Sequence, residues 1–250
     1  MILKILPPIV LAMAFMAHPH DAVAQGLPAL NITQGTDATS YSLSYQILIL
    51  MTALTVLPSI VLGMTAFTRV IIVLSILRQA LGTQQTPPNQ VLIALALFVT
   101  FYIMNPTLTA LYDQALSPYL DGAMDPQSAI EIGGGIMRGF LIANTRETDL
   151  LMFSDLAGVG PFENPDQVPW SVLMPSFMTS ELKSAFQIGF LLFLPFLVID
   201  MVVASILMSL GMMMLSPVLV SLPFKLLLFV LVDGWALTLG SLAATYATGV

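Results

Sequence analysis

The last two apolar runs of the sequence cover about residues 182–210 and 217–247. Away from their ends they are interrupted by three charged side chains: Asp200, Lys225 and Asp233. A charge near the middle of a membrane costs about 2.5–3.5 kcal/mol on insertion scales, so such a residue marks a functional site or an ion pair by default. Two carboxylates on neighbouring helices are what an intramembrane aspartyl protease needs, whereas a single one serves a proton carrier. An acid beside a base forms a buried pair.

The register of the two helices distinguishes between these three functions. If the two runs form an antiparallel hairpin that turns at Met213, Asp200 lies 13 residues before the turn and Lys225 lies 12 after it, roughly 20 and 18 Å along the axes. Asp233 lies 20 residues after the turn, about 10 Å out of register with Asp200. The register favours an Asp200–Lys225 pair, within one subunit or between two, that fixes the helices together. A gating or proton-linked role ranks second, and proteolysis ranks last.

Between the two runs lie three consecutive methionines, Met212, Met213 and Met214. Gly211 and Pro217 flank them and predict a non-helical loop over 211–217, which completes a second apolar helical hairpin over 185–250. Methionine is flexible and polarisable, so several such loops around one axis could close on irregular objects and repack as they pass. An apolar hairpin turn filled by methionine is the alternative. Irregular backbone at membrane depth lines a cavity or is buried in protein.

The composition indicates a membrane protein. Of the 250 residues, 57% are hydrophobic and only 8% are charged, and the mean hydropathy is +0.92, whereas soluble domains carry about 25% charged residues. The formal net charge of −7 argues against nucleic acid or an anionic lipid surface as a partner. Cysteine is absent, and the two histidines, His18 and His20, lie in a segment that we expect to be removed. The remaining chain would then contain neither His nor Cys, which excludes catalytic triads, imidazole general bases and most zinc sites, and we expect no bound metal or cofactor.

A secretory signal peptide is expected over residues 1–24, because Lys4 is followed by a short apolar stretch and an Ala-Val-Ala motif before Gln25. A short retained anchor is the alternative. Residues 25–44 are rich in Asn, Thr, Gly, Ser and Asp, and they predict a flexible exported linker.

The first apolar helix pair is expected over residues 45–112. Its first run, 43–81, would span roughly 58 Å as one helix against a hydrocarbon core of about 30 Å, so we expect Pro58 to kink it. Gly82 predicts the end of that helix, and Asn89 is expected to cap the second one.

The polar region over residues 113–184 contains ten acidic and three basic residues, for a net charge of −7. The connection over 69–88 carries Arg69 and Arg78 but no acid, and positive loops stay in the cytoplasm. The acidic region is therefore expected on the exported side, which is the periplasm in a Gram-negative cell. Its run Gly133-Gly134-Gly135 predicts a flexible turn or a helix break.

Three long stretches carry a resemblance to a known family: FTRVIIVLSILRQALGTQQTPPNQVLIALALF at 67–98, TSELKSAFQIGFLLFLPFLVIDMVVASILMSLGMMML at 179–215 and SLPFKLLLFVLVDGWALTLGSL at 221–242. They closely resemble the FliP family of flagellar type III export-gate proteins. The stretches occur in the expected order, and the resemblance extends from about residue 45 to 245.

The resemblance implies an all-α membrane protein without enzymatic activity, made of long kinked helical hairpins and an exported helical region. Such a chain would assemble as a homo-oligomer, a pentamer, with FliQ and FliR into a helical ring in the bacterial inner membrane, within the flagellar basal body. Unfolded flagellar subunits would cross this pore, driven by the proton motive force and delivered by a separate ATPase and the large export-gate proteins. The flagellum would depend on it for assembly.

The resemblance also assigns roles at the hairpin. Three residues would form the methionine gasket that seals the channel until substrate arrives: Met212, Met213 and Met214. Asp200 and Lys225 match polar positions that are important for assembly or opening of the gate.

In the exported region, Phe140, Phe153 and Glu181 match positions at contacts between copies of the chain, with Arg146 as a candidate partner of Glu181. Without the resemblance, the alternative to an export gate is a monomeric or dimeric secondary transporter in which Asp200 carries the proton.

Overall fold

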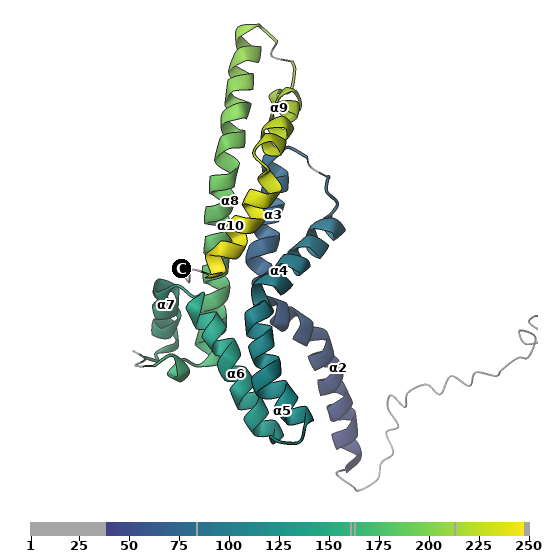
Figure 1. Cartoon of the computed structure of the whole chain (residues 1–250), viewed down its shortest axis with the longest axis vertical. Coiled ribbons are helices and arrows are strands. Elements are labelled where there is room, and N and C mark those ends of the chain that lie inside the picture. Colours follow the sequence, from purple (N-terminus) through teal and green to yellow (C-terminus); the bar gives the residue numbers. More distant parts are fainter. Residues whose placement is uncertain (1–38, 84, 161, 163, 213, 248–250) are drawn as a thin grey trace, which may run out of the picture. The chain divides into compact units, whose positions relative to one another are not determined.

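The computed structural model describes residues 39–83, 85–160, 162, 164–212 and 214–247 (Figure 1), and all regular structure in this part is helical. The expected signal peptide over 1–24, the linker residues 25–38 and Met213 lie outside the described residues. The chain divides into two compact units, Met1–Thr55 and Val56–Val250.

Helix α2 covers Thr39–Gly63, so it begins inside the stretch expected to be a linker. The apolar run does not break at Pro58, which lies within α2, but at residues 64–66, before α3 (Phe67–Ala80). The Thr65 hydroxyl donates to the Leu62 carbonyl (2.9 Å) and accepts from the Phe67 backbone N–H (3.3 Å). This side chain competes with the helical backbone bonds, which explains a break that the hydropathy does not show.

Helix α4 (Asn89–Leu111) continues as a π-helical turn, η1 (Tyr112–Leu116), and a short helix, α5 (Ser117–Leu120). Asn89 does not cap α4 as expected: its side-chain oxygen accepts a hydrogen bond from Arg78 Nη1 at 2.6 Å.

Helix α6 (Pro126–Ala143) contains the glycine run, so the expected turn or break at Gly133–Gly135 is wrong. A Cβ at Gly133 would lie 3.7 Å from the Ala115 Cβ of η1, so small residues bring the two elements close together. Asp125 caps α6 by accepting from the Ser128 and Gln127 backbone N–H groups and from the Ser128 hydroxyl, and these bonds hold the pKa of Asp125 below its ordinary value.

After α7 (Glu147–Ala157) and a 3-10 turn, η2 (Pro165–Gln167), the chain enters α8, which runs without a break over Trp170–Ser209. Its 40 residues correspond to about 60 Å. The expected boundary between exported region and second hairpin, at 184/185, therefore falls inside one helix (Figure 1).

The last apolar run is divided into α9 (Pro217–Leu231) and α10 (Gly234–Ala247), which are bent by 62° relative to each other. Asp233 has a φ of 50° at this break. A Cβ at Gly234 would lie 2.2 Å from the Phe229 ring, so only glycine fits there without a shift of that ring.

Helix α3 lies at the centre of the second unit. Its apolar positions recur at helical spacing and join residues of α4, α8 and α10 in one core cluster: Val70, Val73, Leu74, Leu92, Ala96, Ala185 and Leu242. Among the described residues, Asn89–Leu120 and Trp170–Ser209 are long and apolar enough to cross a membrane, and up to four spans result if each bent pair counts as one. The chain is thus an all-α protein with candidate membrane spans.

Candidate functional site

Asp200 and Lys225 meet between α8 and α9. The Lys225 Nζ lies 2.6 Å from Asp200 Oδ2, and the Ser221 hydroxyl donates to Asp200 Oδ1 at 2.5 Å. The Lys225 side chain is 3% exposed and that of Asp200 is 27% exposed. The level register expected for the two residues is therefore present within one chain.

Lys225 also donates to the Ala80 carbonyl at 3.1 Å. Ala80 is the last residue of α3, where backbone carbonyls lack intrahelical partners and a cation is favoured. A Cβ at Gly82, where the φ is +79°, would lie 3.6 Å from Leu222 and 4.0 Å from the Lys225 Nζ. One ammonium group thus joins the C-terminal end of α3 to α8 and α9.

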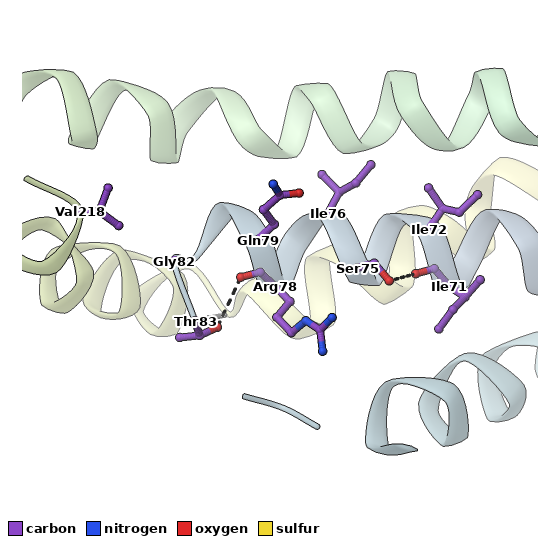
Figure 2. Close-up of a pocket in the computed structure, with 9 residues that line it drawn as sticks. All are labelled: Ile71, Ile72, Ser75, Ile76, Arg78, Gln79, Gly82, Thr83 and Val218. Atoms are coloured by element: carbon purple, nitrogen blue, oxygen red, sulfur yellow. Dashed lines mark hydrogen bonds between the residues drawn. The ribbon is translucent and has the colours of Figure 1, made fainter. Parts of the chain in front are cut away.

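A cleft of 720 Å³ lies beside this contact (Figure 2). It is lined by one side of α3, from Ile71 to Gln79, by Gly82 and Thr83 just beyond the end of α3, and by Val218 of α9. Ile76 and Gln79 point toward the ribbon of α8, whereas Arg78 points to the opposite side. The C-terminal part of α3 therefore keeps an open flank that carries both apolar and polar side chains.

The methionine loop forms the turn of the α8–α9 hairpin. The Met212 N–H donates to the Leu207 carbonyl and the Gly211 N–H to the Met208 carbonyl, which with a φ of +76° at Gly211 makes a Schellman cap. Pro217 then starts α9 at its first position. Met212 is 40% exposed and Met214 is fully exposed, so the loop places apolar side chains outward at the tip.

Glu181 does not pair with Arg146 in this chain. Both oxygens of its fully buried carboxylate bind Arg69, with Nη2–Oε1 at 2.6 Å and Nε–Oε2 at 3.0 Å. Arg146 instead donates from Nη2 to Ser184 Oγ (3.0 Å) and Gln187 Oε1 (2.6 Å). The Arg69–Glu181 pair was not predicted, although a lone base in an apolar run was the available signal.

Phe140 and Phe153 are half-buried and pack against the core cluster that includes Leu141, Leu173 and Phe177. The Phe140 and Phe177 ring centroids are 6.1 Å apart. Both phenylalanines therefore serve packing within the chain and also keep an exposed part.

A third charged cluster lies at Asp149, and sequence reasoning missed the partners of this residue. This side chain is 1% exposed, accepts from Ser180 Oγ at 2.8 Å and forms an ion pair with Lys183. Burial alone would raise the pKa of Asp149, but the hydrogen bonds from Lys183 and Ser180, with the charges of Lys183 and Arg146, outweigh it and hold the pKa below its ordinary value. No sequence spacing marks this cluster, since 31 and 34 residues separate Asp149 from its partners.

Comparison with known proteins decides the family. Residues 50–242 match the FliP family. The flagellar biosynthetic protein FliP of Cereibacter sphaeroides is 78% identical over 221 residues, which cover 88% of this chain and 73% of that protein. Those of Pectobacterium carotovorum subsp. carotovorum and Bacillus subtilis are 52% and 48% identical, covering 94% and 87% of this chain and 91% and 98% of their own length. The chain belongs to the FliP family.

As a FliP-family protein the chain is a membrane-associated component of flagellar biosynthesis and protein export, and its role is structural, not enzymatic. Both oxygens of Asp200 are engaged by Ser221 and Lys225, and Asp233 is exposed at the break between α9 and α10, so the two acids do not form the carboxylate dyad of a protease. Within the described residues, no three His, Cys, Asp or Glu side chains are grouped to hold a metal ion.

Proposed function

We propose that this FliP-family chain is a pore-forming core subunit of the flagellar type III export gate. It conducts unfolded flagellar subunits across the inner membrane in the flagellar basal body, and its methionine loop seals the channel until a substrate enters. The export role is the family's; the pore and its seal are inferred from this chain.

The observation that carries the proposal is the exposed methionine tip of the α8–α9 hairpin. Met212 and Met214 are held outward by a capped loop and remain exposed to solvent. Such side chains need a partner, and a single loop cannot close a channel. Several copies around an axis bring the tips together into one flexible apolar constriction.

The Asp200–Lys225 pair supports the seal by fixing the hairpin that carries it. Because Lys225 also binds the end of α3, the position of the loop is coupled to the first apolar helix pair. We assign the pair to assembly or opening of the gate on this ground.

The proposed partners are inferred from the apolar surface that remains exposed on the helices. Large apolar side chains are exposed along α4, α8 and α9, beyond what a soluble monomer shows. We propose that other copies, in a pentamer, and the FliQ and FliR subunits cover them. We propose that residues 113–184 lie on the exported side, in the periplasm, and that the surface around Phe140 and Phe153, braced by Glu181 and Arg146, is the contact between copies there. The large export-gate proteins and the substrates in transit complete the set.

The seal is tested by replacing the three loop methionines by glycine. Cells with this variant should leak ions and small solutes through assembled gates, measured as loss of membrane potential and dye entry. Replacement by three leucines keeps the apolar bulk and should leak far less. Met201→Ala, on an exposed position within α8, is the control outside the loop. Unchanged permeability in the glycine variant, with normal gate assembly, would contradict the seal.

A further inference from the structure

Tyr246, in the last turn of α10, completes the buried pair of Arg69 and Glu181. Its hydroxyl donates to Glu181 Oε2, and its ring covers the guanidinium of Arg69, whose Cζ lies 4.0 Å from the ring centroid. Thr245 accepts from Arg69 Nη1 at 3.0 Å. Every nitrogen of the guanidinium therefore has an acceptor. Glu181 accepts from Nε and Nη2, and the last turn of α10 supplies the acceptor for Nη1.

The same ring lies against Phe140. The Phe140 and Tyr246 rings are stacked, with centroids 6.2 Å apart and planes inclined by 10°. Tyr246 thus joins α10 to three other helices, since Arg69 belongs to α3, Phe140 to α6 and Glu181 to α8.

Phe140 and Glu181 are two of the positions proposed to lie at contacts between copies. Glu181 is 0% exposed, and its carboxylate already accepts three hydrogen bonds, so it has no free face for another copy. An effect of Glu181 on a neighbouring copy must therefore pass through the surface that it holds in place, and Phe140 is the part of that surface that Tyr246 touches.

We propose that Tyr246 is a positioning residue for assembly: the docked end of α10 fixes Arg69, Glu181 and Phe140 in one arrangement, and this arrangement presents the face on which a second copy binds. The inference rests on the proposed function for that second copy and for its contact near Phe140. The π face of the ring carries the effect, since one side covers a cation and the ring also packs on an aromatic neighbour.

The test compares Tyr246→Phe with Tyr246→Leu. Phenylalanine keeps the ring over Arg69 and against Phe140 and loses one donor, whereas leucine fills space without a π face. We expect the oligomer fraction of detergent-extracted protein to stay within about twofold of the parent for Phe and to fall about tenfold or more for Leu. If Tyr246 only filled volume, the two variants would have equal oligomer fractions, and that result would overturn the proposal. The same pair of substitutions at Tyr102, 75% exposed on α4, is the control, and an equal loss there would also overturn it.

A second readout reports α10 docking in the chain itself. The sequence has no cysteine, so a single Leu242→Cys substitution, at a fully buried core position of α10, gives one thiol for maleimide labelling. Tyr246→Leu should speed this labelling about tenfold, and Tyr246→Phe only slightly; Leu237→Cys, on an exposed position, should label quickly in every background. If Tyr246→Leu speeds the labelling of the thiol at position 242 but leaves the oligomer fraction unchanged, the proposal is overturned. Slow labelling of that thiol in the parent and in both Tyr246 variants would also overturn it. A parent chain that forms no oligomer would instead contradict the proposed function, and its labelling would still show whether Tyr246 docks α10.

Discussion

At the residue scale, three buried or half-buried acids define how the helices meet. Asp200, Glu181 and Asp149 each bind a base from another helix and also accept from a hydroxyl. A charge left without its partner in such a place is strongly unfavourable, whereas removal of both charges is often neutral. These pairs therefore specify which helix faces come together more than they add net stability.

Lys225→Met should lower the free energy of unfolding by about 3 kcal/mol, the lower end for a broken buried pair because Asp200 keeps part of its exposure. It leaves both the carboxylate and the Ala80 carbonyl without this donor. The combined variant Lys225→Met with Asp200→Leu should be closer to the parent than Lys225→Met alone, in a double-mutant cycle of denaturation in detergent. Strictly additive losses would show that the two side chains are not coupled.

Asp149 makes the folding stability of the chain depend on pH in the acidic range. Because its folded-state pKa lies below the unfolded value, near 3.8, its contribution is complete above that value and is lost as the pH falls through the lower, folded-state pKa. The Tm of the parent should thus decline more steeply below pH 4 than that of Asp149→Asn. Asp166→Asn removes an exposed carboxylate as a control, and equal flattening by both would contradict the assignment.

At the element scale, the helices are interrupted where single residues require it. Hydropathy indicates unbroken apolar runs over residues 43–81 and 217–247. The breaks lie where the Thr65 hydroxyl bonds to the backbone and where Gly234, without a Cβ, leaves room for the Phe229 ring. Neither break produces a periodic pattern in the sequence, so neither could be predicted from hydropathy. The Asp200–Lys225 register was predictable, since it follows from counting residues from one turn along two uninterrupted segments.

Gly234→Ala should destabilise the chain by about 1–3 kcal/mol, since its Cβ would overlap the Phe229 ring. Gly240→Ala lies in the same helix with nothing within 4 Å of the new Cβ and should be neutral or slightly stabilising. Thermal unfolding of the two variants in the same detergent makes the comparison. If Gly234→Ala matched Gly240→Ala, the packing reason for the break would be wrong.

At the scale of the whole molecule, the family and the all-α membrane class were accessible from the sequence, because composition and long motifs carry them. The Arg69–Glu181 pair was not, because its members are 112 residues apart and only the packing of α3 on α8 brings them together. The glycine run in α6 was misjudged for the same reason: its use is the approach of η1, a contact between elements.

For the whole molecule, the prediction concerns the oligomeric state. Native mass of the detergent-extracted protein, expressed alone and then with FliQ and FliR, should show a discrete ring-sized species that gains these partners. Packing of the apolar faces of α4, α8 and α9 against neighbouring subunits is expected to hold this species together. A stable monomer or dimer that ignores the partners would return Asp200 to a transporter hypothesis.

The distance in sequence between Arg69 and its partners has a consequence for biosynthesis. At about 5–20 residues per second, Arg69 is made roughly 6–22 s before Glu181, which follows 112 residues later, and earlier still than Tyr246. During this interval an unpaired guanidinium is unfavourable in hydrocarbon, and its long side chain keeps it near water. Helix α3 therefore reaches its central place only after α8 has been translated. The order of translation is thus not the order in which the helices reach their final positions.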